Sequence, residues 1–259
     1  MNKIICALLV IFMSSCSSIN YIQVFETNTS NTKNIDSCYT YEDDTVKITY
    51  SFWTNKGIMN FEIYNKLNIP FYVDWKNSSL IINDIKLNYW EDVTNSNTMS
   101  NYSTYYYKGQ TLVTTNGVSL SRTSKPERIT FIPPKSKYGC SNYYLFPFKY
   151  FEMKKYESKK MKYSTIYYQN FNIQNSPLRF RNYVSLTFSE ESKKFKIIDN
   201  EFFVSSIKEM TNIHFQGKMN QSTNKFEFPY TSPRSFYLKI PRKNSWHYIL
   251  DQNDSYWPQ

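Results

Sequence analysis

The stretch VKITYSF at residues 46–52 alternates apolar and polar side chains without a break. Successive side chains of a β-strand point to opposite faces, so this pattern is typical of a strand with one buried face. A short turn containing Gly57 follows, and residues 59–63 (MNFEI) alternate again. We therefore predict a β-hairpin whose apolar side chains share one core, namely Val46, Ile48, Tyr50, Phe52, Met59, Phe61 and Ile63.

Further strands are predicted beyond this hairpin. Residues 70–75 (PFYVDW) begin with a proline, where a missing N–H does least harm to a strand, and residues 80–82 form the next strand. Later candidates are 129–132, 182–188, 195–198, 202–207, 226–228 and 236–240. Segments 91–126 and 152–176 are less patterned, and we expect long connections or irregular strands there. One short helix is a candidate around Phe203, Ile207 and Met210.

The composition agrees with a β protein. Ala7 is the only alanine, whereas Tyr, Phe, Ile and Thr, which favour strands, are abundant. Many short strands separated by Asn- and Ser-rich turns predict an all-β, antiparallel sandwich with long irregular connections. The formal charge of +10 reflects an abundance of lysine, which also accompanies AT-rich codon usage. We do not interpret this charge as a sign of nucleic-acid binding.

The N-terminus has the pattern of an export signal. Met1-Asn2-Lys3 is followed by ten apolar residues at 4–13 and then by Ser14-Ser15-Cys16. Ten residues span about 15 Å as a helix, half of a roughly 30 Å hydrocarbon core, so a permanent membrane span is not expected. The segment at 13–16 resembles the lipobox of bacterial lipoprotein precursors, which implies cleavage after residue 15 and a lipid on Cys16. The alternative is an ordinary secretory signal in which Cys16 is incidental.

The rest of the chain is divided as follows. Residues 16–44 are rich in Ser, Asn and Thr, and we expect a lipidated N-terminus followed by a flexible tether. Residues 45–245 form the sandwich body, either as one unit or as two sub-domains with a boundary near 150–176. Residues 246–259 are expected to be a C-terminal tail.

Two cysteines remain after Cys6 is removed with the signal and Cys16 is lipidated. Cys38 and Cys140 both lie among polar residues, and an oxidising envelope favours a disulfide between them. Two unpaired thiols are the alternative. Their spacing does not fit a metal site, and we expect neither a metal nor a cofactor.

The sequence contains no motif for catalysis. His214 and His247 are the two histidines, and there is no nucleophile elbow, phosphate-binding glycine loop or metal-ligand cluster. We therefore predict no catalytic residues. Carboxylates that converge only in the fold remain an alternative, because glycoside hydrolysis needs only their spatial proximity. The adjacent acids are at 42–44, 91–92 and 190–191.

Aromatic residues make up 19% of the chain, which raises the question of a ligand platform. Tyr105, Tyr106 and Tyr107 lie in a weakly patterned segment and are the candidates for stacking on a sugar. The alternative is that the aromatic residues serve as core and cross-strand packing. The lysine-rich stretch at 149–162 is either a solvated surface or a contact for anionic lipid headgroups.

A resemblance supports the fold and the compartment. Residues 48–83, 176–183 and 199–204 look like segments of uncharacterised lipoproteins of the Bacteroidota. This resemblance implies an immunoglobulin-like β-sandwich, and the family brings no known activity or functional residues.

Together these patterns predict a non-catalytic binding or interaction module of the cell envelope. It is attached to the membrane through lipidated Cys16, and its expected partner is another envelope protein or a glycan rather than nucleic acid. Lipoproteins that Bacteroidota send to the cell exterior carry acidic residues just after the lipidated cysteine. The first acid here is Glu26. We therefore expect an outer-membrane lipoprotein that faces the periplasm. An envelope hydrolase is the alternative function.

Overall fold

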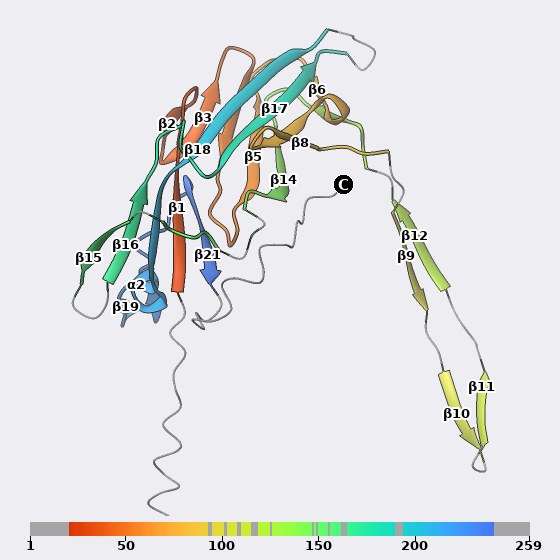
Figure 1. The fold of residues 1–259 in the computed structure, drawn as a ribbon. Helices are drawn as coiled ribbons and strands as arrows, with labels where there is room; N and C mark the ends of the chain where they lie inside the picture. The colour runs from red at the N-terminus through yellow and green to blue at the C-terminus, as the bar shows by residue number, and fades with distance from the viewer. Residues whose placement is uncertain are drawn as a thin grey trace, which may run out of the picture.

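A computed structural model describes residues 21–240, apart from 93–94, 101–102, 108–109, 115–118, 125, 147, 149, 155, 162–164 and 190–193. Between 93 and 125 it describes strands but no side chains. The described chain is nearly all β and its sheets are antiparallel (Figure 1). The predicted all-β antiparallel sandwich is therefore confirmed.

The larger sheet has ten strands, and six of them form its main path. In spatial order these are β13 (Ile129–Ile132), β6 (Phe71–Asp74), β17 (Arg179–Thr187), β18 (Lys196–Thr211), β1 (Tyr21–Thr29) and β21 (Ser235–Ile240). Four strands branch from this path: β7 (Ser79–Ile82), β8 (Ile85–Asn88), β15 (Glu157–Lys160) and β16 (Thr165–Asn170). The 16-residue strand β18 pairs with β17, β1 and β16 and is the central element of the sheet.

The smaller sheet has five strands in a simple order. These are β14 (Lys137–Tyr144), β5 (Ile58–Asn65), β4 (Val46–Tyr50), β3 (Cys38–Glu42) and β2 (Lys33–Ile35). The predicted hairpin is its centre, because β4 and β5 pair with Ile48 opposite Ile63. All seven apolar residues predicted to share its core are at most 1% exposed.

The remaining elements are short. Strands β9 (Asn95–Ser100) and β12 (Ser119–Ser124) pair with each other, as do β10 (Ser103–Tyr107) and β11 (Gln110–Thr114). In Figure 1 these two pairs extend as an arm away from the sandwich. A 3-10 turn η1 (Trp75–Asn77), the helix α2 (Asn212–Gln216) and the small hairpin of β19 (Met219–Asn220) and β20 (Lys225–Phe226) complete the fold.

Aromatic rings fill the space between the two sheets. Phe202 of β18 packs against Tyr50 of β4 and against Phe52, with ring centroids 4.8 and 5.3 Å apart. Phe52 also meets Phe180 of β17 edge-on at 5.3 Å. Such edge and offset contacts add about 0.5–1.5 kcal/mol each beyond the burial of area. The inward-facing aromatic residues are thus mainly core packing.

A buried polar network also joins the sheets. The Tyr50 hydroxyl donates to Asn200 at 2.7 Å, and the Asn182 amide donates to the Tyr50 oxygen at 3.2 Å. The Tyr89 hydroxyl in turn donates to Asn182 at 2.7 Å. Asn182 and Asn200 face each other on β17 and β18 and are at most 1% exposed. Because a displaced sheet would leave these buried groups without partners, the network defines how the two sheets align.

The predicted flexible tether over 16–44 is wrong for its described part. Residues 21–29 form β1, a strand paired on both sides in the larger sheet, and Val24 and Phe25 are fully buried. Its polar side chains are satisfied by distant partners. Gln23 donates to the Phe151 carbonyl at 2.6 Å and to Glu209 at 3.0 Å. Polar residues such as Gln23 at buried positions interrupt the alternation of apolar and polar side chains. The local sequence therefore did not reveal β1.

The option of two sub-domains is also not what the structure shows. One hydrophobic cluster extends from Phe25 to Leu238 and contains residues from both sides of the suggested boundary at 150–176. Strand β16 lies within that boundary segment and pairs with β18. The helix candidate around Phe203, Ile207 and Met210 is wrong as well, because these residues lie in β18 and the helix begins one residue after it, at Asn212.

Candidate functional site

The outer face of the smaller sheet carries two rows of polar side chains. The strand register places one row across four strands, in the order Glu42, Lys47, Tyr64 and Lys137. The adjacent row, two residues along each strand, reads Thr40, Thr49, Glu62 and Gly139. These are the outward positions of the same strands whose inward positions build the core.

This face is hollowed between the rows. The depression has a volume of about 320 Å³ and is lined by Glu42, Lys47, Thr49, Glu62, Tyr64 and Lys137. Thr49, one of the lining residues, has a short side chain, and Gly139, which lies opposite Glu62 on β14, has none. A Cβ placed on Gly139 would meet no atom within 4 Å, so open space lies above this glycine.

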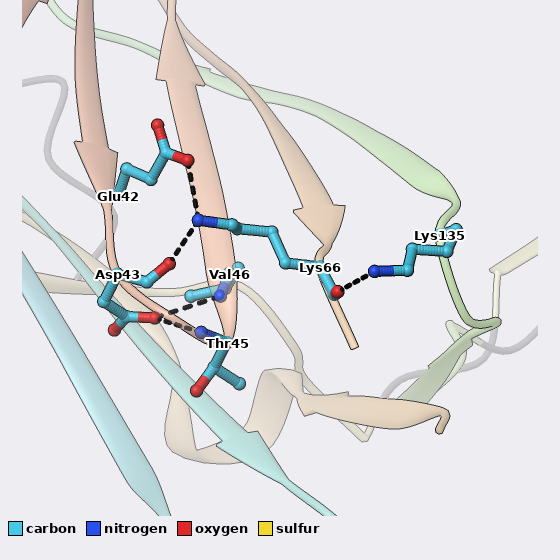
Figure 2. A network of polar contacts seen from close by, with 6 residues as sticks. All are labelled: Glu42, Asp43, Thr45, Val46, Lys66 and Lys135. Carbon is cyan, nitrogen blue, oxygen red and sulfur yellow. Dashed lines mark hydrogen bonds and ion pairs between the residues drawn. The ribbon is translucent and has the colours of Figure 1, made fainter. Parts of the chain in front are cut away.

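Three of the four charged side chains that line the depression, those of Glu42, Glu62 and Lys137, take part in ion pairs. Lys137 Nζ lies 2.8 Å from Glu62, diagonally across β14 and β5. Lys66 lies 2.7 Å from Glu42 and also donates to the Asp43 carbonyl at 2.8 Å, as Figure 2 shows. The hydrogen bond from Lys66 lowers the pKa of Glu42, so this carboxylate is ionised at neutral pH. The depression therefore presents carboxylates and lysine ammonium groups close together.

Asp43 anchors the β3–β4 turn beneath this site. Its carboxylate accepts from the backbone N–H groups of Thr45 and Val46 at 2.8 and 3.0 Å (Figure 2). It also lies 2.7 Å from Lys196, the first residue of β18 in the other sheet. Burial raises the pKa of Asp43, but Lys196 and the two N–H groups outweigh it and hold the pKa at about 2. This contact ties the end of the depression to the larger sheet.

Strand β14 is an edge of the smaller sheet, because β5 is its one strand neighbour among the described residues. Ser141, Asn142, Tyr143 and Tyr144 are exposed along it. An unpaired strand edge offers backbone N–H and C=O groups to an extended segment of a partner. The depression and this edge are continuous, since Lys137 lines the depression and lies on β14.

The predicted disulfide between Cys38 and Cys140 is wrong, and both are free thiols. On β14, Cys140 lies opposite Phe61 of β5. Phe61 lies opposite Tyr50 of β4, and Tyr50 lies opposite Tyr39, the residue after Cys38. Three strand spacings of about 4.8 Å place the two Cα atoms roughly 14 Å apart. A disulfide needs less than about 7 Å.

Neither thiol has the environment of a reactive cysteine. Burial raises the pKa of Cys140 to about 12. Burial and the nearby Asp36 carboxylate also raise the pKa of Cys38. Both are protonated at neutral pH, and the thiolate is the nucleophilic form.

The side chains of the other predicted sites are not described. Cys16 with the signal at 1–15 and the tail at 246–259 lie outside the described residues. Tyr105, Tyr106 and Tyr107 lie on β10, but their side chains are not described. In the described part of the chain, no cluster of three or more His, Cys, Asp or Glu side chains has a metal-binding arrangement. No helix there is long and apolar enough to cross a membrane.

The sequence interpretation missed the depression. Lys47, Thr49 and Glu62 were recognised only as the polar half of alternating strands. Strand order and register then place them beside Lys137, which is 75 residues from Glu62 in the chain, and local periodicity does not carry that information. Comparisons with family models, curated proteins and solved structures found no match.

Proposed function

We propose that this protein is a lipid-anchored, non-catalytic binding module of the cell envelope, and that the outer face of the smaller sheet binds another envelope protein. The anchor is Cys16, and the compartment is the periplasmic side of an outer membrane, as in the Bacteroidota lipoproteins that the sequence resembles. The observation that carries the proposal is the depression on this face, which is lined by charged side chains and includes Lys137 of the edge strand β14.

The charges of the depression favour binding over hydrolysis. Glu42 and Glu62 both line it, which is the kind of convergence that an envelope hydrolase requires. A glycosidase needs one carboxylic acid whose pKa is raised, so that it stays protonated and donates a proton. Here each carboxylate is paired with a lysine, and the pKa of Glu42 is lowered. The Glu42 carboxylate therefore remains charged at neutral pH and does not act as a proton donor.

A protein partner fits this face better than a glycan. Sugar-binding sites usually stack an uncharged sugar ring on an aromatic side chain. Tyr64 is the single aromatic residue that lines the depression. Alternating carboxylates and ammonium groups instead set the register and orientation of a complementary protein surface. The adjacent edge strand adds backbone groups that an extended protein segment pairs with.

A photo-crosslinking experiment in intact cells tests the proposal. Benzoylphenylalanine in place of Tyr64 should give a discrete adduct with one envelope protein. The same probe in place of Ile81, a half-buried position on β7 of the other sheet, serves as the control. The adduct should be absent there.

A double charge reversal separates binding from folding. Glu62→Lys combined with Lys137→Glu keeps the internal ion pair but reverses the charges that a partner meets. The double variant should unfold at the same denaturant concentration as the parent and lose the Tyr64 adduct. An adduct that survives the reversal would contradict the proposed surface. An adduct that a glycosidase removes would show that the ligand is a glycan instead.

A further inference from the structure

We propose that the end of the sandwich that carries α2 rests on the surface of the phospholipid bilayer and inserts apolar side chains among its headgroups. We call this region the α2 end and define it as α2, the β19–β20 hairpin with its flanks to Phe228, and Lys159 and Lys160 at the end of β15. The inference rests on the proposed lipid anchor and adds an orientation to it.

The position of β1 brings the anchor to the α2 end. Strand β1 begins at Tyr21, which lies opposite Thr211, the residue that precedes α2. Only residues 17–20 separate Tyr21 from Cys16. Five residue steps span at most about 17 Å of fully extended chain. A lipid on Cys16 therefore keeps the α2 end within that distance of the bilayer, far closer than the predicted flexible tether would.

Large apolar side chains are exposed at this end. Ile213 on α2 is 73% exposed and Met219 is 49% exposed, while Phe226 and Phe228 are 37% and 38% exposed. Buried apolar area of this kind is what holds peripheral proteins at an interface, at about 25 cal/mol per Å². Isolated exposed apolar residues are common, but here four lie within 16 residues of chain beside the anchor.

The segment that carries these side chains is firmly attached to the sandwich. Phe215 of α2 is buried and packs against Trp53 and Tyr237, with ring centroids 6.0 and 5.1 Å apart. Gly217 ends the helix at φ +71°, and the Phe228 N–H donates to the Gln216 carbonyl at 2.9 Å. The exposed side chains are thus presented by a held scaffold, which reduces the entropy lost on insertion.

Lysines lie near these apolar side chains in the chain and in the sheet. Lys218 and Lys225 are exposed at the β19–β20 hairpin. The acidic residue nearest to them in the sequence is Glu227. Two lysines of the lysine-rich stretch, Lys159 and Lys160, also lie at this end. On β16, Tyr167 lies opposite Glu209, near the end of β18. Thr165 comes two residues earlier on β16 and lies opposite Lys160 of β15. This register places Lys159 and Lys160, both exposed, level with the start of α2.

This combination fits anionic phospholipid headgroups. Apolar side chains enter the boundary between headgroups and acyl chains, and lysines around them pair with phosphates at about 1 kcal/mol each. The depression of the smaller sheet then lies toward the end of β18 that is farther from the bilayer. Asp43, at the end of the depression, contacts Lys196 at the first residue of β18, and α2 follows the last residue. The first and last residues of β18 are fifteen residue steps apart, a distance of at most about 50 Å along the strand.

Vesicle binding of protein that carries no lipid tests the inference. The mature chain with Cys16→Ser should co-sediment with vesicles of phosphatidylglycerol and phosphatidylethanolamine, and much less with phosphatidylcholine alone. Lys218→Glu and Lys225→Glu should each weaken this binding at least roughly fivefold, the factor that about 1 kcal/mol represents. Ile213→Asp should weaken it to a similar or greater degree. Unfolding curves confirm that each variant folds.

Two matched controls keep the test specific. Phe131→Asp changes an apolar side chain that is 51% exposed on β13, and Lys86→Glu changes an exposed lysine on β8. Neither should affect vesicle binding. Equal losses in the controls, or α2-end variants that bind like the parent, would overturn the orientation. Mass spectrometry of the membrane-bound wild type tests the Cys16 lipid separately, so vesicle binding without lipidation would reject the anchor and leave the bilayer contact standing.

Discussion

At the scale of single residues, buried polar groups decide how the two sheets fit together. Tyr50 is fully buried, and burial raises the pKa of its hydroxyl, which therefore stays protonated and donates to Asn200. The same oxygen accepts from Asn182. One hydroxyl thus satisfies two buried amides on β17 and β18 from the opposite sheet.

Tyr50→Phe should therefore destabilise the fold without creating a cavity. It leaves one acceptor on Asn200 and one donor on Asn182 unsatisfied in the core, which costs about 1–3 kcal/mol. Urea denaturation followed by fluorescence measures the loss. Tyr64→Phe, on the outer face, is the control and should change stability by less than about 0.5 kcal/mol. Equal effects in the two variants would show that the buried network contributes nothing.

Asp43 gives the fold a defined dependence on pH. Its pKa is about 2 in the folded protein, against about 3.9 in an unfolded chain. Because the pKa is lower in the folded state, the ionised carboxylate stabilises the fold at pH values above the unfolded-state pKa. This contribution is lost as the pH falls from about 4 through about 2. Asp43→Asn should cost up to about 2 kcal/mol at neutral pH and almost nothing at pH about 2. Denaturation curves at both pH values check this, and a loss that does not change with pH would argue against it.

At the scale of elements, β1 shows why a strand can escape local pattern recognition. Four consecutive residues, 22–25, are buried, and Gln23 is one of them. This is because β1 is covered on both faces and paired on both edges. An alternating pattern arises only when one face meets water. Strands β4 and β5 have such a face, and their prediction was confirmed residue by residue.

Phe25→Ala distinguishes a core strand from a tether. Phe25 stacks on Phe236 of β21 at 4.7 Å and contacts Phe146 at 5.1 Å. Its loss should cost about 3–5 kcal/mol, as should that of Phe61, which lies in the predicted hairpin. Thermal or urea unfolding measures both variants. If Phe25→Ala were as stable as the parent, residues 21–29 would behave as the flexible segment that the composition suggested.

At the scale of the whole molecule, the proposed anchor, bilayer contact and binding face form one axis. Strand β18 runs from Lys196, beside the end of the depression, to Thr211, beside the start of β1 (Figure 1). A lipid on Cys16 would hold one end of this axis at the membrane and direct the other into the aqueous compartment.

Cys16→Ser should abolish stable membrane attachment in cells. Two or three acyl chains contribute about 0.8 kcal/mol per buried methylene, far more than the α2 end supplies by itself. Labelling with a palmitate analogue, followed by fractionation, measures the effect. Unchanged labelling of the variant would refute lipidation at this cysteine. Protease treatment of intact cells tests the compartment, and loss of the domain while the outer membrane is intact would place it outside the cell.

The amino-acid sequence alone determined the β character of this chain, the β4–β5 hairpin and the side chains that its inner face buries. These follow from alternation between neighbouring residues, which a strand with one wet face imposes directly. Only the tertiary structure decided that residues 21–29 form a core strand, that Cys38 and Cys140 lie too far apart to bond, and that Glu62 meets Lys137. Each of these depends on which strands become neighbours and in which register, and contacts between residues far apart in the chain determine both.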